Sequence, residues 1–237
     1  MKLNRKPIIG IVSKHFLKNE IRPNTFIRDE IKQAIFDNGG IAIGIMFPKN
    51  EKNNVGDKWE NNLNDIECNN LISQINLCDG ILFQGGKACD NYEMIVAKYC
   101  YDKNIPTLGI CCGQNVMVMA LGGTTKLIEN IEKHNTNDLY AHDVKIIPNT
   151  KFFKIVGKEK IRVNSRHEKT VDTHPNLIVN CICEDGYIDG LESPDKDFYI
   201  AFRFHPESLY TIDKNHNKIF REFIGACSRE KTKPKIW

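Results

Sequence analysis

The residues best suited to covalent chemistry are two adjacent cysteines in the sequence Gly-Ile-Cys-Cys-Gly at 109–113. An apolar, strand-like run at 105–110 precedes them, and a helix-like run at 115–121 follows. A sharp turn of this kind holds a nucleophile in strained backbone geometry, and the flanking glycines leave room for it. The start of the helix carries partial positive charge, which favours a thiolate. We predict Cys111 as the nucleophile; the alternative reading is a pair of small buried cysteines in a strand–helix turn.

A cysteine nucleophile needs a base, and the base needs a group that orients it. Of the seven histidines, His205 stands where an alternating apolar run at 198–204 ends. Pro206 fixes the exit of the chain from this strand. Glu207 comes two residues after the histidine, where an extended chain returns to the same side. We therefore predict His205 as the base and Glu207 as the carboxylate that orients it.

An oxyanion formed at this thiol needs backbone N–H donors close to the sulfur. One donor is expected from Cys112, the residue after the nucleophile. The other is expected from Gly86 in the Gly85-Gly86 turn, which follows a strand-like run at 79–83 and so lies at the carboxyl end of a neighbouring strand. The alternative reading of this turn is an ordinary one, in which glycine supplies a positive φ.

These residues need a sheet that brings several strand ends together. A strand at 8–12, an amphipathic helix at 26–36 capped by Asn24 or Thr25, and a strand at 41–47 follow one another as in a parallel βαβ unit. The further expected elements are helices at 66–77, 91–103, 115–121 and 216–227, strands at 79–83 and 105–110, and shorter strands at 142–146, 161–163, 177–183, 187–191 and 198–204. We expect an α/β fold with a mostly parallel central sheet and a smaller, β-rich C-terminal half.

One domain is expected to span residues 1–237, because no linker and no internal repeat interrupts this order of elements. A stretch rich in Asn, Lys and Glu at 49–65 has few apolar residues, and we interpret it as an exposed insertion. Residues 228–237 are expected to form a polar, basic tail.

Composition and charge exclude several classes of protein. The net charge of +3 is mild and spread along the chain, so nucleic acid is not an expected partner. No apolar stretch reaches the roughly 20 residues that cross a bilayer, so a membrane is not an expected partner either. The nine cysteines are an odd number without a Cys-x-x-Cys pair, which is typical of reduced thiols and predicts a cytoplasmic protein.

The histidines other than His205 predict no metal site. His142 has no metal-ligand partner at a useful spacing. Together with His15, His134 and His216 it is expected to be a surface or hydrogen-bonded structural residue.

Several motifs follow one another in the order and spacing of a known family. They are Asp79-Gly80-Ile81-Leu82-Phe83-Gln84-Gly85-Gly86, the elbow at 108–115, Ala120-Leu121-Gly122-Gly123, Val163-Asn164-Ser165-Arg166-His167, Asp185-Gly186-Tyr187-Ile188-Asp189-Gly190-Leu191-Glu192 and Phe204-His205-Pro206-Glu207. With these motifs the chain resembles the class I glutamine amidotransferase superfamily. It is most similar to the free-standing γ-glutamyl hydrolase branch, the peptidase C26 group that includes γ-glutamyl-γ-aminobutyrate hydrolases. The resemblance runs from Pro7 to about Tyr210.

The resemblance implies a flavodoxin-like three-layer sandwich and a catalytic triad of Cys111, His205 and Glu207, with no cofactor. The thiolate would attack the γ-carbonyl of a glutamyl group, expel the amine and form a γ-glutamyl thioester that water hydrolyses. Gly86 and Cys112 would supply the oxyanion N–H groups. The implied substrate neighbours are Gly85, Asn115, Ser165, Arg166 and His167, with a solvated side chain as the alternative for Arg166.

The chain departs from the family pattern around the substrate and keeps the triad. Cys112 stands where the family has Arg, Leu or Tyr, and Asn115 replaces a glutamine that is one methylene longer. Lys87-Ala88 stands in place of an aspartate after the double glycine, and His167-Glu168-Lys169 in place of His-His-Gln. These changes favour a non-standard substrate, with loss of activity as the alternative.

We expect a hydrolase that releases glutamate and an amine from a small γ-glutamyl compound. The 237 residues contain no Gly-x-x-x-x-Gly-Lys phosphate loop and leave no room for a synthetase domain, so no ATP chemistry is expected. One alternative is a glutaminase subunit that passes ammonia to a separate synthetase, and another is a catalytically silent binding protein of the same fold. The expected partners are therefore the small-molecule substrate and either a second copy in a homodimer or a synthetase subunit.

Overall fold

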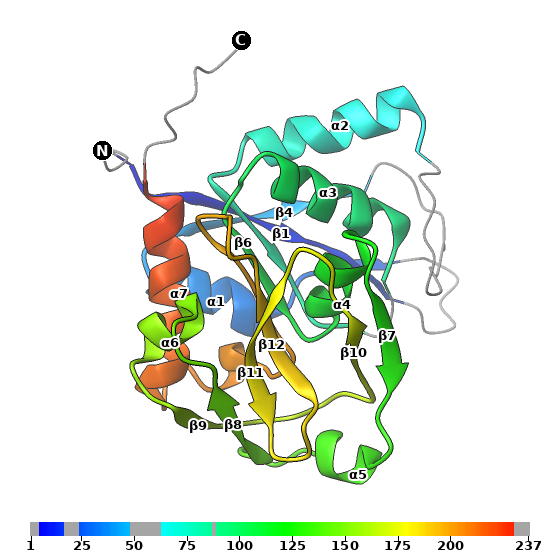
Figure 1. Cartoon of the computed structure of the whole chain (residues 1–237). Coiled ribbons are helices and arrows are strands. Elements are labelled where there is room, and N and C mark those ends of the chain that lie inside the picture. Colours follow the sequence, from blue (N-terminus) through cyan, green and yellow to red (C-terminus); the bar gives the residue numbers. More distant parts are fainter. Residues whose placement is uncertain (1–4, 17–23, 48–62, 87–88, 230–237) are drawn as a thin grey trace.

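The computed structural model describes residues 5–16, 24–47, 63–86 and 89–229 (Figure 1). The strands are β1 (Ile8–Val12), β2 (Lys14–Phe16), β3 (Asn24–Phe26), β4 (Ile41–Ile45), β5 (Gly80–Phe83), β6 (Thr107–Ile110), β7 (Thr124–Leu127), β8 (His142–Ile146), β9 (Lys160–Val163), β10 (Lys169–Thr173), β11 (Ile178–Cys183), β12 (Ile188–Glu192) and β13 (Tyr199–Phe202). The α-helices are α1 (Asp29–Asp37), α2 (Asp65–Asn76), α3 (Asn91–Asp102), α4 (Cys112–Met119), α5 (Ile131–His134), α6 (Lys151–Val156) and α7 (Lys214–Cys227), and a 3-10 turn η1 spans Pro206–Ser208.

A nine-stranded mixed sheet forms the middle layer, in the order β4-β1-β5-β6-β13-β12-β11-β8-β9. The pairs from β4 to β13 are parallel, and the pairs from β13 to β9 are antiparallel. One sheet therefore runs through both the βαβ half and the β-rich half of the chain. Two further sheets have two strands each, β2 with β3 and β7 with β10.

Helices cover both faces of the parallel part of the sheet (Figure 1). Alternate residues of β13 point to opposite faces, so Phe202 joins one core cluster and Ala201 the other. The first cluster contains Ile31 and Ile35 of α1, Phe152 of α6 and Phe220 and Phe223 of α7, whereas the second contains Leu71 of α2, Val96 of α3 and Val116 of α4. The expected flavodoxin-like arrangement of helix, sheet and helix is thus confirmed.

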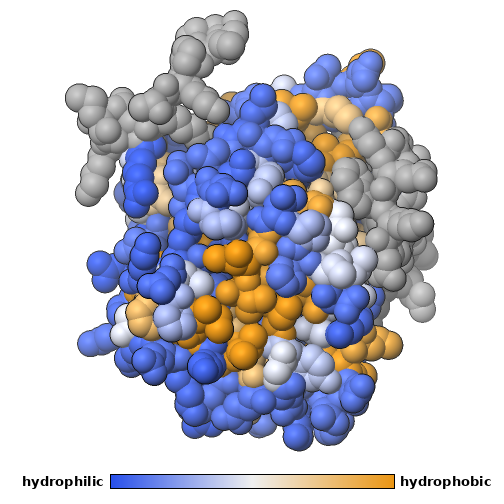
Figure 2. All heavy atoms as spheres, viewed as in Figure 1, coloured by the Kyte–Doolittle hydropathy of each residue, from blue (hydrophilic) through white to orange (hydrophobic). Residues whose placement is uncertain are grey.

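The antiparallel half of the sheet is less completely covered. All four residues of β5 are buried, and so are those of β6 and β13, whereas β11 begins with an exposed residue and has two half-buried ones. Figure 2 shows apolar side chains gathered on the viewed face over β11 and β12. On these strands, Ile178 is 40% exposed, and Val179 and Ile188 are partly buried.

The first helix begins later than its sequence pattern predicts, because the preceding residues form β3 and pair with β2. Asn24 and Thr25 therefore do not cap α1, and Arg28 stands at the N-cap position. The buried side chain of Gln84 fixes this path: it accepts a hydrogen bond from the N–H of Arg28 and donates one to the carbonyl of Phe26, both at 3.0 Å. The periodicity of apolar residues cannot predict such a long-range contact.

Helix α4 begins at Cys112, three residues before the start predicted from the apolar pattern. Its first turn contains Gly113, where an added Cβ atom would collide with the carbonyl oxygen of Phe83. The glycine thus lets the helix start directly at the elbow and pack against β5. The short elements β2, β3, β7, β10, α5 and α6 also lie outside the predicted set, because they are too short or too polar to leave a periodic pattern.

Most of the expected insertion at 49–65 and of the expected tail at 228–237 lies outside the described residues, and so do Lys87 and Ala88. At the described end of the insertion, Asn64 caps α2: its side chain accepts a hydrogen bond from the N–H of Glu67 at 3.0 Å. In the described part of the chain, no helix combines the length and apolarity needed to cross a membrane.

Candidate active site

Cys111 occupies the sharp turn between β6 and α4. Its φ of 53° and ψ of −108° place a non-glycine residue at positive φ, a conformation that costs on the order of 1–3 kcal/mol. The N–H of Cys111 donates to the carbonyl of Phe202 at 2.8 Å, which anchors the turn to β13. The geometry is that of the elbow expected from the sequence, with the side chain held at the head of a helix.

His205 follows β13 and is held from two directions. Its Nδ1 atom lies 2.7 Å from Oε1 of Glu207. The side chain of Asn164 clamps its main chain, accepting from the N–H of His205 at 2.7 Å and donating to its carbonyl at 2.9 Å. Because a carboxylate only accepts, Nδ1 carries the proton and Nε2 is the atom left to exchange one with a nucleophile.

Gly85 lies against both the nucleophile and the base. A Cβ atom at this position would come within 3.0 Å of Cε1 of His205 and 3.3 Å of Cβ of Cys111. The two catalytic candidates thus converge on one glycine of the turn after β5. Gly86 lies under the side chain of Lys14, whose Cε atom would be 3.1 Å from an added Cβ.

Cys111 and His205 shift each other's protonation. Burial alone raises the pKa of the Cys111 thiol, but the charge of His205, its hydrogen bond and the charge of Arg203 outweigh burial and lower the pKa. Burial alone lowers the pKa of His205, whereas Glu207 and Cys111 raise it to about 10. A thiolate paired with an imidazolium is therefore the favoured resting state, and it is the reactive state of a cysteine nucleophile.

Arg203 links the nucleophile to the first helix turn. Its Nη1 atom donates to the carbonyl of Cys111 at 3.1 Å and to Oδ1 of Asn115 at 2.5 Å. Arg203 is only 3% exposed. Since the guanidinium engages the amide oxygen of Asn115, the amide NH2 of that side chain is the end left to donate to a substrate.

A buried charged cluster lies behind the elbow, around the second cysteine. The Nζ atom of Lys14 is 2.7 Å from Oε2 of Glu93 and 3.6 Å from Sγ of Cys112, and the Sγ atoms of Cys89 and Cys112 are 3.2 Å apart. The hydrogen bond with Cys89 and the charge of Lys14 outweigh burial and lower the pKa of Cys112 to about 6. Burial raises the pKa of Glu93 to about 8 despite Lys14. Two acids thus share one buried cation.

Comparison with known proteins identifies the family. The family model described as Peptidase C26 matches residues 7–207. The chain belongs to the peptidase C26 family. Among curated proteins, it is 27% identical over 205 residues to the CTP synthase of Chlamydia abortus, covering 71% of this chain and 38% of that protein. It is 31% identical over 146 residues to a Schizosaccharomyces pombe protein named as a glutamine amidotransferase, covering 57% of this chain and 56% of that protein.

Solved structures share the fold. The Trypanosoma brucei CTPS glutaminase domain with bound acivicin superposes with a TM-score of 0.63 at 16% identity, covering 97% of both chains. This peptidase C26 chain thus has the glutamine amidotransferase fold, and its family is one of amide-bond hydrolases. The chain spans about 38% of the length of the Chlamydia abortus CTP synthase, so it matches only part of that protein.

The other residues that the family resemblance assigns to the substrate each have a polar contact within the chain. Ser165 is fully buried, and its hydroxyl donates to the carbonyl of His134 at 2.6 Å. Arg166 is exposed and reaches Oγ of Ser208 at 3.3 Å. Nδ1 of His167 is 3.1 Å from the carbonyl oxygen of Lys169, and burial together with Arg203 lowers the pKa of this histidine far below its ordinary value.

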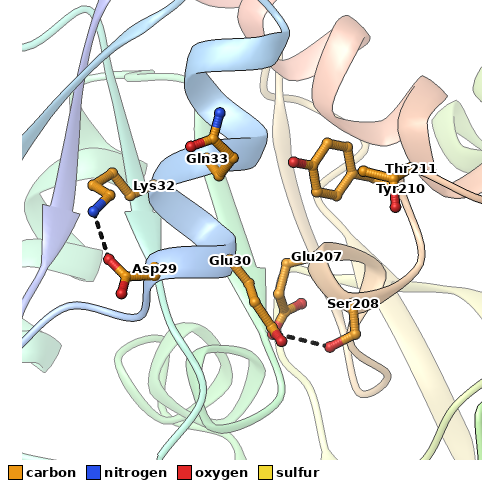
Figure 3. Close-up of a pocket in the computed structure, with 8 residues that line it drawn as sticks. All are labelled: Asp29, Glu30, Lys32, Gln33, Glu207, Ser208, Tyr210 and Thr211. Carbon is orange, nitrogen blue, oxygen red and sulfur yellow. Dashed lines mark hydrogen bonds and ion pairs between the residues drawn. The ribbon is translucent and has the colours of Figure 1, made fainter.

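The pocket drawn in Figure 3 has a volume of about 500 Å³ and is lined by polar side chains of α1 and of the segment from Glu207 to Thr211. Glu207 lines it, whereas Cys111 and His205 do not. Across it, Oγ of Ser208 donates to Glu30 at 3.0 Å. The pocket therefore borders the triad at its carboxylate and is separate from the place where a carbonyl would meet the thiol.

Sequence reasoning missed Lys14, Glu93, Arg203 and Asn164 as parts of the site. Lys14 interrupts the apolar run of the first strand, and Arg203 interrupts a row of buried aromatic residues. Both can therefore be recognised in the sequence as charged residues among apolar ones. A charged residue between buried strand positions is costly unless it is paired. The partners, Glu93 and Asn115, lie about 80 to 90 positions away and are found only from the fold.

Proposed function

We propose that this chain hydrolyses the γ-glutamyl amide bond of a small compound and releases glutamate and an amine. The observation that carries the proposal is the Cys111–His205–Glu207 arrangement at a nucleophile elbow, in a chain of the peptidase C26 family. The lowered pKa of Cys111 supports it, because the thiolate is the attacking species.

The reaction follows from the positions of these groups. The thiolate of Cys111 adds to the γ-carbonyl carbon, and the oxygen that becomes negative is met by the N–H groups of Cys112 and Gly86. Cys112 begins α4, so its N–H belongs to the first helix turn, where backbone donors face an anion. The His205 imidazolium then gives its Nε2 proton to the departing nitrogen, the C–N bond breaks, and a γ-glutamyl thioester remains on the sulfur.

Hydrolysis reverses these roles. Neutral His205 takes a proton from water, the hydroxide adds to the thioester carbonyl, and the C–S bond breaks to return the thiolate and free glutamate. Glu207 stabilises the imidazolium in both steps and holds its ring in one orientation. The proton that His205 gives to the amine in the first step is regained from water in the second, so the thiolate–imidazolium pair is restored at the end of the cycle.

Substrate contacts are assigned by position. The amide NH2 of Asn115, fixed by Arg203, is placed to donate to a carboxylate or carbonyl of the glutamyl group. Gly85 lets the substrate backbone approach the thiol, since it carries no Cβ between Cys111 and His205. Ser165, Arg166 and His167 remain proposed pocket residues on the basis of the family motif.

A second candidate is a glutaminase that supplies ammonia to a separate synthetase. It is favoured by the similarity to a CTP synthase over only 38% of that protein's length. In this case free glutamine is the preferred substrate, activity of the chain alone is weak, and a partner subunit stimulates it. A catalytically silent chain would show neither activity.

One experiment separates these functions. Purified protein is given glutamine and a panel of γ-glutamyl amines, and glutamate release is measured for the wild type, Cys111→Ala and Cys68→Ala, the last being a half-buried cysteine on α2. Preference for a γ-glutamyl amine, lost by about 10⁴-fold in Cys111→Ala and kept in Cys68→Ala, supports the hydrolase. Preference for glutamine supports the ammonia-supplying subunit. Absence of glutamate release from every substrate contradicts both.

A further inference from the structure

Three potential metal ligands meet at one end of the antiparallel half of the sheet. His134 ends α5, His142 begins β8, and Cys183 ends the neighbouring strand β11. One side-chain nitrogen or sulfur atom from each residue lies within 4.8 Å of the other two. The three residues are separated in the chain by 8 and 41 positions, so the fold brings them together.

A carboxylate orients each of the two histidines by contacting Nε2, the ring nitrogen opposite Nδ1. Nε2 of His134 is 3.4 Å from Oδ2 of Asp185, and Nε2 of His142 is 2.7 Å from Oδ2 of Asp189. A carboxylate only accepts, so each Nε2 carries the proton and each Nδ1 has its lone pair available. A carboxylate that holds the distal N–H of an imidazole is the usual support of a metal-binding histidine.

The two lone pairs have no partner in the described part of the chain. The Nδ1 atoms of His134 and His142 are both buried and accept no hydrogen bond there. His134 is only 2% exposed, and its ring lies 4.9 Å from that of His142, centroid to centroid. A buried polar atom without a partner is costly, so two such atoms on residues that meet Cys183 favour a ligand that accepts electron pairs.

Cys183 supplies the third donor. It is 4% exposed and ends β11, the strand that pairs with β8. A metal ion binds cysteine as the thiolate, so it displaces the thiol proton, which leaves to solvent as the metal–sulfur bond forms. Release of that proton gives the binding a signature that a hydrogen-bonded water molecule would lack.

We propose that His134, His142 and Cys183 form a binding site for a divalent first-row transition metal, for which Zn²⁺ fits best. Two imidazoles and one thiolate are typical zinc ligands, whereas Mg²⁺ and Ca²⁺ require oxygen ligands. Tetrahedral zinc with bonds of roughly 2.0–2.3 Å needs ligand atoms about 3.3–3.6 Å apart, so the side chains have to close by at most about 1.5 Å on binding. Water fills the fourth position, and the ion ties α5 to β8 and β11.

The proposed metal site and the proposed catalytic site share no residue. None of the three residues belongs to the triad or the expected oxyanion donors. His134 does touch the proposed substrate segment, because its carbonyl accepts the hydroxyl of Ser165 at 2.6 Å. The ion would therefore stiffen the support of that segment without entering the reaction.

The test measures metal binding by the full chain. Protein treated with a chelator is titrated with Zn²⁺ by calorimetry in two buffers of different ionisation enthalpy, and with Co²⁺ by absorption spectroscopy. Wild type is expected to bind one equivalent with release of a proton, and to show a thiolate-to-cobalt charge-transfer band. Cys183→Ser and His142→Gln should each weaken binding by at least about 100-fold and remove or shift the band, whereas Mg²⁺ should not bind.

Matched control variants test whether other thiols bind the metal and whether a substitution unfolds the protein. Cys181 lies two residues before Cys183 on the same strand, and Cys112 is the second thiol of the elbow. Cys181→Ala and Cys112→Ala are both expected to keep the zinc equivalent and the cobalt band. Circular dichroism establishes that each variant is folded, and His134→Gln replaces His142→Gln if the latter is not. The proposal is overturned if folded wild type binds no zinc, if the ligand variants bind it as wild type does, or if Cys112→Ala abolishes binding.

Discussion

The ammonium group of Lys14 lies 3.6 Å from the sulfur of Cys112, one residue past the nucleophile. The same group forms a fully buried ion pair with Glu93 at 2.7 Å. Burial by itself would lower the pKa of Lys14, but Cys112 and Glu93 raise it, so the lysine stays charged. The second cysteine of the elbow is thus part of an electrostatic cluster that also packs against Gly86.

Lys14→Met is expected to destabilise the protein by about 3–5 kcal/mol, because it leaves Glu93 buried without its cation. The matched control is Lys32→Met, which breaks an exposed pair with Asp29 and should cost less than about 1 kcal/mol. Urea unfolding of both variants measures the difference. Similar losses of stability in the two variants would show that the buried pair has no special role.

Gly85→Ala is expected to impair catalysis more than folding. The added Cβ would lie 3.0 Å from the His205 ring and 3.3 Å from Cβ of Cys111, so one of them has to move. A misplacement of about 1 Å in a catalytic pair can cost about 10²-fold, so this smaller displacement is expected to lower kcat by up to about 10²-fold. Gly225→Ala in α7, which meets no atom within 4 Å, should leave kcat unchanged and stabilise the helix by up to about 1 kcal/mol. Equal kcat values for the two variants would contradict the placement of Gly85 in the site.

The fold, and the site residues that lie in sequence motifs, can largely be predicted from the local sequence. The strand at 8–12 matches β1 residue for residue, because a buried parallel strand is a continuous apolar run between breakers. The elbow is equally local, since glycines flank Cys111. What the sequence does not reveal depends on tertiary contact, such as the pairing of Arg203 with Asn115.

The histidine cluster shows the same limit. His134 and His142 are expected from the sequence to be surface or hydrogen-bonded residues, and each is hydrogen-bonded to an aspartate, but their meeting with Cys183 lies outside that prediction. A zinc motif read from sequence relies on short, regular ligand spacing. Cys183 comes 41 residues after His142, on a strand that pairs with β8, so no local sequence pattern indicates that the two residues meet.

The pair formed by His205 and Cys111 predicts a defined pH dependence of stability. The folded-state pKa of His205 is raised to about 10 from an ordinary value of 6.5, so the folded protein binds the proton more tightly. Its contribution is therefore complete below pH 6.5 and is lost as the pH rises toward 10. The lowered pKa of Cys111 contributes with the opposite sign, so the comparison uses a Cys111→Ala background. The difference in unfolding free energy between Cys111→Ala and Cys111→Ala/His205→Gln should be largest near pH 6 and shrink by pH 10, because Glu207 still raises the pKa of His205.

The control for this measurement is His174→Gln, a histidine between β10 and β11 that lies outside the site and contacts the carbonyl of Leu177. Its effect in the Cys111→Ala background should change little over the same range. A His205→Gln difference in this background that stays constant or grows between pH 6 and pH 10 would contradict the raised pKa of His205.

Asn115→Ala tests how the substrate is recognised. Loss of one hydrogen bond to a glutamyl carboxylate should raise KM by about tenfold or more, corresponding to about 1.5–3 kcal/mol, with a smaller change in kcat. Asn115→Gln, which restores the family residue, should shift preference among γ-glutamyl amines. Unchanged KM values in Asn115→Ala would place the glutamyl group elsewhere.

The central claim is that Cys111 carries a γ-glutamyl group during turnover. Protein mixed with its best γ-glutamyl substrate, quenched in acid within one turnover and analysed by intact-protein and peptide mass spectrometry, tests this most directly. The account predicts a gain of one γ-glutamyl group per chain, located at Cys111 in the Cys112→Ala background and absent from Cys111→Ala. Turnover without any adduct on Cys111, or an adduct that persists in Cys111→Ala, would contradict it.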